Sequence, residues 1–315
     1  MKSYKSHLLS VKSYGENPIP RKPVYRGSAI FPVFNSKNNS TRILFMGYWI
    51  VKNGIENLAL LITLRDEYGK LLIRENQKIN DTSPREIHIS DLLKDQYQSF
   101  TGSIELEIFS TVDLVFPFPA FVVNYFNDES STSVHTTGRI YNDYEDMTSN
   151  NVSKVKECGF DILASRDIET FFLFVNGHIK NDNCEFDFEI INSNNESIKK
   201  SISIGPVVPL QTVIVKINDF VELEHFLKGE PGTIKINHTL IGFFPRFIAG
   251  NIVKANNSMS VTHTYYDNSE DTRESAYWVN ELPEELIDSS VFVPILLEDN
   301  YYTQLKLYPI YSPST

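Results

Sequence analysis

The feature that most constrains the fold is an internal repeat that covers most of the chain. Lys52-Asn53 recurs as Lys180-Asn181, and Ile89-Ser90-Asp91 recurs as Ile217-Asn218-Asp219, about 128 residues later in both cases. Self-similarity at a near-constant spacing indicates two copies of one domain. Further matches keep a similar separation: Gly102-Ser103-Ile104 with Gly232-Thr233-Ile234, Phe118-Pro119-Ala120-Phe121 with Phe244-Pro245-Arg246-Phe247, and Ser133-Val134 with Ser260-Val261.

Alternating apolar residues within each copy predict β-strands with one buried face. The first copy contains Leu58-Leu60-Ile62-Leu64, and the second contains Phe186-Phe188-Ile190. A period of two is typical of a half-buried strand. The connections are short enough for hairpins, whereas a parallel sheet needs long helical crossovers. We therefore expect an all-β protein made of two tandem antiparallel β-sandwich, jelly-roll-like repeats, with a barrel as the alternative.

The strand period is interrupted once in each copy, at 90–98 and at 218–227. Asp219 followed by Glu222 resembles a capping box, and Gly229 suits the end of a helix. The sequence therefore predicts one short helix in each repeat.

The repeat also predicts the domain boundaries. We expect an N-terminal arm at 1–24, repeat 1 at 25–148, repeat 2 at 152–275, a linker at 276–290 and the first strands of a partial third repeat at 291–315. The third repeat rests on Val291-Phe292-Val293-Pro294-Ile295, which is similar to Ala29-Ile30-Phe31-Pro32-Val33. Because two strands cannot form a core, they either complete a neighbouring sheet or belong to a fragment of a longer repeat protein, and we favour the fragment.

Charge and hydropathy exclude several partners. The net charge of -11 and the pI near 5.2 would repel a phosphate backbone, so we expect no nucleic-acid partner. The N-terminal segment lacks the apolar core of a secretory signal, and no stretch is long enough to span a bilayer. We therefore expect a soluble, cytoplasmic protein with no membrane span.

The common catalytic motifs are missing from the sequence. Cys158 and Cys184 have no CxxC spacing, the histidines show no metal-binding spacing, and there is no phosphate-binding loop, GxGxxG or GxSxG. We expect no metal and no cofactor, and whether the chain is an enzyme stays open. Glu105 and Glu107 are interpreted as exposed residues that favour solubility.

One stretch near the end of each copy combines histidine, hydroxyl, aromatic and acidic residues. In the second copy it holds His263, Tyr265, Tyr266 and Asp267, and Arg246 precedes it. Alternation along one strand would separate Thr262, Thr264 and Tyr266 from His263 and Tyr265. The histidines would face opposite sides if the Ser-Val pairs are aligned, unless a bulge intervenes. The counterparts in the first copy are His135, Tyr141 and Asp143.

Three functions are consistent with these patterns. We favour a non-catalytic binding or scaffold protein in which those residues recognise carbohydrate, a cell-envelope polymer or a protein partner. The second is an enzyme acting on a carbohydrate-like or other small polar substrate, with His263 as acid/base and Asp267 orienting it. The third is a structural module of an appendage or virion that self-associates through its terminal strands. The alternative is that the same residues have only a structural role, with their polar groups hydrogen-bonded at a sheet surface or domain interface.

Overall fold

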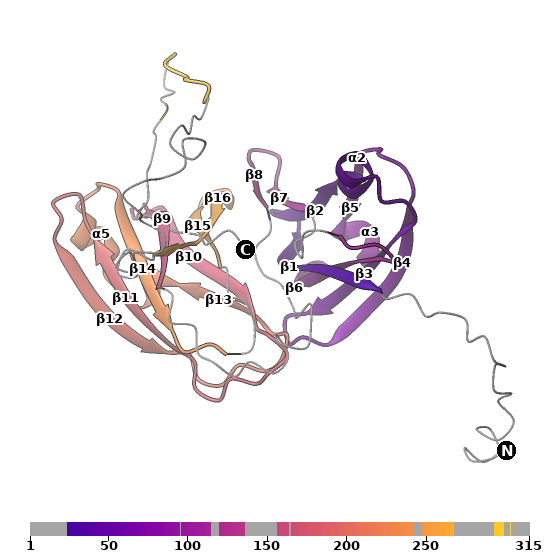
Figure 1. The fold of residues 1–315 in the computed structure, drawn as a ribbon. Helices are drawn as coiled ribbons and strands as arrows, with labels where there is room; N and C mark the ends of the chain where they lie inside the picture. The colour runs from indigo at the N-terminus through magenta and orange to yellow at the C-terminus, as the bar shows by residue number, and fades with distance from the viewer. Residues whose placement is uncertain are drawn as a thin grey trace, which may run out of the picture.

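The computed structural model describes residues 24–94, 96–114, 120–135, 156–163, 165–241, 247–267, 293–298 and 303, without the side chains of 156–159 and 265–267. Strands dominate this part of the chain, and the strand pairs within it run antiparallel (Figure 1). The predicted all-β sandwich class is confirmed.

The first repeat, as far as it is described, forms one eight-stranded sheet that folds over on itself. Its long strands β1 and β6 pair along their whole length, whereas β1 and β2 meet only at Asn35 and Ser40. The elements are β1 (Tyr25–Ser36), β2 (Ser40–Phe45), α2 (Tyr48–Asn53), β3 (Leu58–Asp66), β4 (Leu71–Ile79), β5 (Arg85–His88), α3 (Ile89–Leu93), β6 (Ser99–Ser110), β7 (Val122–Phe126) and β8 (Ser131–His135).

The second repeat, as far as it is described, forms a four-stranded and a five-stranded sheet. The elements are β9 (Lys156–Ile162), β10 (Ile168–Val175), β11 (Glu185–Ile191), β12 (Ser197–Ser203), β13 (Thr212–Lys216), the 3-10 turn η1 (Ile217–Asp219), α5 (Leu223–Leu227), β14 (Gly232–His238), β15 (Ile248–Val253), β16 (Ser258–His263) and β17 (Tyr265–Asp267).

Strand order is the same in both repeats. The layer β4-β3-β6-β1 corresponds to β12-β11-β14-β9, and the layer formed by β5, β2, β7 and β8 corresponds to β13-β10-β15-β16. The pairing register makes individual residues equivalent: Leu64 opposite Ile104 matches Ile190 opposite Ile234. Positions can therefore be compared between the repeats by their place in the ladder.

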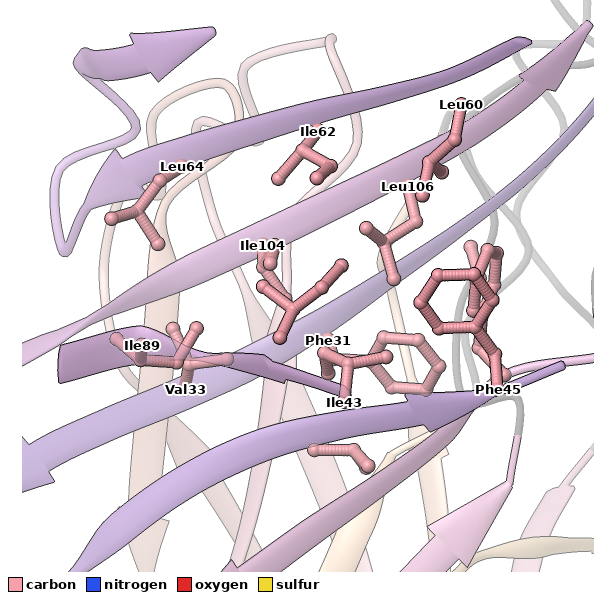
Figure 2. Packing of buried hydrophobic residues seen from close by; sticks show 14 of the residues in the cluster. Phe31, Val33, Ile43, Phe45, Leu60, Ile62, Leu64, Ile89, Ile104 and Leu106 are labelled. Atoms are coloured by element: carbon pink, nitrogen blue, oxygen red, sulfur yellow. The ribbon is translucent and has the colours of Figure 1, made fainter. Parts of the chain in front are cut away.

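Each repeat buries its own apolar side chains between the layers. Figure 2 shows side chains of the first cluster from β1, β2, β3 and β6 pointing into a common space, among them Phe31, Ile43 and Ile62. The second cluster is rich in phenylalanine, with the ring of Phe172 packed against Phe186, Phe188 and Phe247. Burial of large rings and branched side chains provides the main driving force for both repeats.

The strand β10 is buried on both faces and joins the two repeats. Phe172 and Phe174 point into the second cluster, whereas Phe171 and Leu173 belong to the first cluster together with Ile248 and Met259 of neighbouring strands. The outer face of the layer β13-β10-β15-β16 therefore packs against the first repeat. A continuous apolar run is the expected sequence of a strand that is covered on both sides.

The short helices form in the regions that the sequence predicts, but they begin and end differently from the prediction. α3 and α5 lie where they were predicted, but α5 has no side-chain cap and Asp219 belongs to a preceding 3-10 turn, so the predicted capping box is wrong. The helices end at Lys94 and Lys228, which both adopt left-handed backbone conformations. The first repeat has an additional short helix, α2, which places Trp49 in the core.

The ends of the predicted domains lie largely outside the described residues. The boundaries between the repeats and after the second repeat fall within 136–155 and 268–292, so they stay predictions. In the proposed third repeat, residues 293–298 form no strand and expose Val293, Ile295 and Leu297. Within the described part of the chain, no helix has the length and apolar character needed to cross a lipid bilayer.

Candidate functional site

His135 and His263 meet where the two repeats touch. His135 pairs with Val122, and His263 pairs with Ile248, the equivalent residue of the second repeat. The histidines are therefore equivalent, and the match of Ser133-Val134 with Ser260-Val261 is one residue out of register. The prediction that the two histidines face opposite sides rested on that match and is wrong: their rings lie edge to face, with centroids 4.9 Å apart.

The edge strands β8 and β16 form the contact between the repeats, which we call the seam. Thr132 Oγ1 accepts a hydrogen bond from the backbone N–H of Val261 at 3.2 Å, and the Asn127 side chain donates to the carbonyl oxygen of Asn256 at 3.1 Å. The side-chain amide of Asn256 in turn donates to Glu129. These contacts advance together along both strands, so β8 and β16 run in the same direction. Two otherwise open sheet edges thereby shield each other.

His263 is buried in this seam, with 4% of its surface exposed, whereas His135 is exposed. Nδ1 of His263 lies 3.0 Å from the carbonyl oxygen of Thr264. Because a carbonyl oxygen only accepts, Nδ1 carries the proton in this hydrogen bond. Burial and this hydrogen bond hold the His263 ring in place between the repeats.

The remaining predicted site residues are divided between two sheets or lie outside the description. The strand with His263 ends there, and β17 begins at Tyr265 in the other sheet, where Tyr266 pairs with Glu157 and Asp267 with Lys156. The expectation of one continuous strand from 262 to 266 is wrong, because the chain crosses between layers at Thr264. The side chains of Tyr265, Tyr266 and Asp267, together with Arg246, Tyr141 and Asp143, lie outside the described residues.

A charged network covers the outer face of β1, β3 and β6 in the first repeat. Glu105 contacts Arg65 at 2.8 Å and Arg26 at 3.2 Å, and Glu107 contacts Arg26 at 2.7 Å and Arg74 at 3.9 Å. Glu105 is 4% and Glu107 is 7% exposed, so the interpretation of both as exposed residues is wrong. Burial raises the pKa of Glu105, with a further contribution from Glu107, while the arginines oppose the shift. Arginine side chains fill this face.

The equivalent face of the second repeat is an open groove of about 330 Å³ on β11, β12 and β14. Figure 1 shows β11 and β12 on the side of the second repeat away from the first. Ladder register places Lys235 at the position of Glu105 and Ile191 at the position of Arg65. The groove, as we use the term, is lined by Asp187, Phe188, Glu189, Lys199, Lys200, Ser201, Lys235 and Asn237.

Two cross-strand rows organise the polar side chains of the groove. In one row Asp187 of β11 lies between Ser201 and Asn237, and Ser201 donates a hydrogen bond of 2.5 Å to its carboxylate. In the other row Glu189 lies between Lys199 and Lys235, and the Lys199 ammonium is 3.4 Å from its carboxylate. The rows are two residues apart along the strand, which corresponds to about 7 Å. The central strand thus offers acceptors, with donors on both sides.

Sequence patterning anticipated the strands of the groove but not the groove itself. The alternation in 186–190 predicts that Asp187 and Glu189 lie on the wet face. The alternation does not show which residues of distant strands lie beside Asp187 and Glu189. Those neighbours are determined by the pairing of β11 with β12 and β14. The sequence difference that could have indicated the groove is the change from a negatively charged residue, Glu105, to a positively charged one, Lys235, at equivalent positions of the two repeats.

Two other titratable groups are buried among the described side chains of the second repeat. Burial lowers the pKa of His238 to about 4, and its two ring nitrogens have no hydrogen-bond partner among the described residues. Burial raises the pKa of the Cys184 thiol to about 12, so this free cysteine is a packing residue rather than a nucleophile. Within the described ranges, no three histidine, cysteine or acidic residues gather in a way that could hold a metal ion.

Comparison with known proteins gives structural neighbours only. No family model and no curated protein matches the sequence. Matching structures include a putative beta-galactosidase from Bacteroides fragilis, with a TM-score of 0.17 and 9% identity over 76% of this chain and 32% of that one. A calcium-binding mutant of Bacteroides uniformis beta-glucuronidase 2 has a TM-score of 0.16 and 10% identity over 77% of this chain and 26% of that one.

A glycosyl hydrolase family 2 member from Bacteroides cellulosilyticus gives a TM-score of 0.15 and 8% identity, over 76% of this chain and 28% of that one. The chain therefore spans a third or less of the length of these three structures. Similarity at this level assigns no activity to the chain.

Proposed function

We propose that the chain is a non-catalytic binding protein that recognises carbohydrate through the groove on β11, β12 and β14. The observation that carries the proposal is the groove itself, an open polar hollow on a sheet face whose equivalent in the first repeat is filled. Its volume of about 330 Å³ lies at the lower end of the range of about 300–1,000 Å³ that is usual for ligand sites.

The polar groups of the groove suit the hydroxyl groups of a sugar. Each sugar hydroxyl can both donate and accept a hydrogen bond. Asp187 and Glu189 offer acceptors on the central strand, and the flanking amide of Asn237 offers both functions. Because Asp187 and Asn237 are exposed, a ligand can reach them without a conformational change of the sheet.

The first repeat supports a specialised role for this face in the second repeat. At equivalent ladder positions Glu105 and Glu107 are held by Arg65 and Arg26, which leaves a packed charged surface. The second repeat has Lys235 and Asn237 instead, and the hollow between the strands stays open. Functional sites are added to folds locally, so divergence of one copy at one face is the expected pattern of such a site.

The surroundings of His263 favour binding over catalysis. A general acid or base must lie within hydrogen-bond reach of the reacting group. His263 is instead buried between the repeats, and its Nδ1 is engaged with a backbone carbonyl. We therefore propose that the groove binds the ligand and that His263 helps to hold the two repeats together.

Affinity electrophoresis against a panel of polysaccharides, followed by calorimetry with the polymers that retard the protein, tests this function. We expect retardation by at least one polymer, and a loss of affinity of at least about tenfold in Asp187→Ala/Asn237→Ala, since hydrogen bonds to charged groups contribute about 1.5–3 kcal/mol each. Both replaced side chains are exposed, so the variant should fold.

The matched control is Asn76→Ala/Lys78→Ala, which removes two exposed polar side chains from β4 of the first repeat. This control should bind like the unmodified chain. Failure of every polymer in the panel to bind, or equal affinity of the Asp187→Ala/Asn237→Ala variant, would exclude the proposed function.

A further inference from the structure

The polar face of the second repeat continues past the groove at one end. Beyond Asp187, the next outward-facing residue of β11 is Glu185, which pairs with Ser203 of β12. On the other side of β11, the backbone N–H of Glu185 donates to Thr239 Oγ1 at 3.0 Å. Glu185, Ser203 and Thr239 are exposed and form a third cross-strand row, about 7 Å from the row of Asp187. We call this row the outer row.

The opposite end of the groove has an apolar residue at the corresponding place. Beyond Glu189, the next outward-facing residue of β11 is Ile191, which is half-buried and pairs with Ser197 and Thr233. Carboxylates therefore occupy the outward positions of β11 from Glu185 to Glu189 and end there. A ligand that lies along β11 gains a further carboxylate contact only in the direction of Glu185.

The carboxylate of the outer row is held in place in the same way as the one in the groove. The side-chain amide of Asn183 donates to Glu185 at 2.6 Å, and the hydroxyl of Ser203 donates to the side-chain oxygen of Asn183 at 3.0 Å. In the groove, Ser201 donates to Asp187. An ionised carboxylate has about four lone-pair sites, so each of these groups can accept further hydrogen bonds. Both carboxylates are therefore oriented acceptors for the donors of a ligand.

This line of carboxylates distinguishes the second repeat from the first. Ladder register places Ala59, Leu61 and Thr63 of β3 at the three equivalent positions. The strand that carries the open groove thus has hydrogen-bond acceptors where the other copy has two apolar side chains and a threonine.

The charges on this face disfavour an anionic ligand. The three carboxylates of β11 face the same side as Lys199 and Lys235, which pair with Glu189 across the ladder. Lys200 pairs with the buried Phe188 and therefore faces the other side of the sheet. Acidic groups thus outnumber basic ones on the three rows, and the whole chain has a net charge of -11. Because like charges repel, a neutral chain rich in hydroxyl donors fits this face better than a polyanion.

We infer that the groove binds the interior of a neutral, linear polysaccharide whose chain runs along β11 and continues over the outer row. This inference rests on the proposed function and names its ligand class and an additional subsite. Among the described residues, those that line the groove come from β11, β12 and β14 alone, so a bound chain can extend past the groove along the strand. Sugar hydroxyls would donate to Asp187 in the groove and to Glu185 in the outer row.

Calorimetry with oligosaccharides of increasing length, prepared from a neutral polysaccharide that retards the protein, tests the inference. We expect the affinity to rise with length until the oligosaccharide covers the groove and the outer row, and then to level off. Glu185→Ala/Ser203→Ala should lower the affinity for the long oligosaccharides by at least about tenfold, because only these reach the outer row. The affinity for the shortest oligosaccharide that binds should stay unchanged. Both replaced side chains are exposed, so the variant should fold.

The matched control is Glu75→Ala/Asn76→Ala, which removes one carboxylate and one neutral polar side chain from the exposed part of β4 in the first repeat. This control should keep the full affinity at every length, which separates a local contact from the change in net charge. The affinity for the neutral oligosaccharides should also be the same at low and high salt, since salt screens interactions between charges.

The outcomes distinguish the inference from the proposed function. Equal affinity of Glu185→Ala/Ser203→Ala for the long oligosaccharides, or an affinity that does not rise with length, overturns the inference. Tighter binding of an anionic polymer than of every neutral one overturns it too. In each of these cases the proposed function stands if Asp187→Ala/Asn237→Ala still weakens binding. Absence of binding to every polymer overturns both.

Discussion

At the scale of single residues, His238 shows how the two copies have diverged inside the core. Ladder register places it opposite Phe186, as Ile108 lies opposite Leu60 in the first repeat. A histidine thus stands where the other copy has an isoleucine, 6% exposed and beside the ring of Phe247. Burial favours the neutral ring, which is why the pKa of His238 falls to about 4.

This burial makes the stability of the second repeat dependent on pH. The unfolded chain takes up a proton at His238 near pH 6.5, whereas the folded chain resists it until about pH 4. The free energy of unfolding should therefore decline as the pH falls from about 6.5 to 4, by about 3 kcal/mol in total. Urea denaturation at a series of pH values measures it. His238→Ile should remove this part of the slope, and an unchanged slope in the variant would contradict the assignment.

At the scale of elements, the two halves keep the same close approaches between strands. A side chain at Gly102 would collide with the backbone carbonyl oxygen of Arg65, and a side chain at Gly232 would lie 2.7 Å from that of Ile191. Arg65 and Ile191 occupy equivalent places on β3 and β11. The glycines are conserved between the copies because the neighbouring strand leaves no room for a Cβ atom.

Gly102→Ala and Gly232→Ala should each lower the free energy of unfolding by about 1–3 kcal/mol, the usual cost of overpacking. Ser103→Ala at the adjacent position is the control. The hydroxyl of Ser103 is buried without a hydrogen-bond partner in the described structure, so its removal should not lower the free energy of unfolding. Equal stability of all three variants in thermal unfolding would argue against the close approach.

The strands show which features of the structure could be predicted from the sequence and which could not. The alternation in 58–64 and 186–190 predicts strands that the structure contains, because a period of two follows directly from strand geometry. The register of β16 was predicted one residue out, since the Ser-Val match ignored a longer β15–β16 hairpin. The burial of Glu105 and Glu107 was missed, because arginines from β1, β3 and β4 cover them. Contacts between distant strands leave no local pattern in the sequence.

At the scale of the whole molecule, the repeats share an apolar interface as well as the polar seam. Leu173 is fully buried and belongs to the same cluster as the core of the first repeat, although it lies on β10 of the second. The two cores are thus separated only by the thickness of one sheet. A substitution that destabilises this sheet should therefore lower the stability of both repeats.

Leu173→Ala should lower the stability of the first repeat as well as that of the second, by about 2–5 kcal/mol. Trp49 lies in the core of the first repeat, and a Trp278→Phe background makes it the only tryptophan. Its fluorescence should report an earlier unfolding midpoint in urea when Leu173 is replaced. A midpoint that does not move would show that the first repeat folds independently of β10.

We propose that one duplicated sheet face is filled in the first repeat and open for a ligand in the second. Backbone amide shifts of the isotope-labelled chain, recorded while the polymer bound in the calorimetric screen is added, test it most directly. We expect the perturbed amides to lie on β11, β12 and β14, and those on β3, β4 and β6 to stay unchanged. Perturbations centred on β3, β4 and β6, or on the seam at His135 and His263, would contradict it.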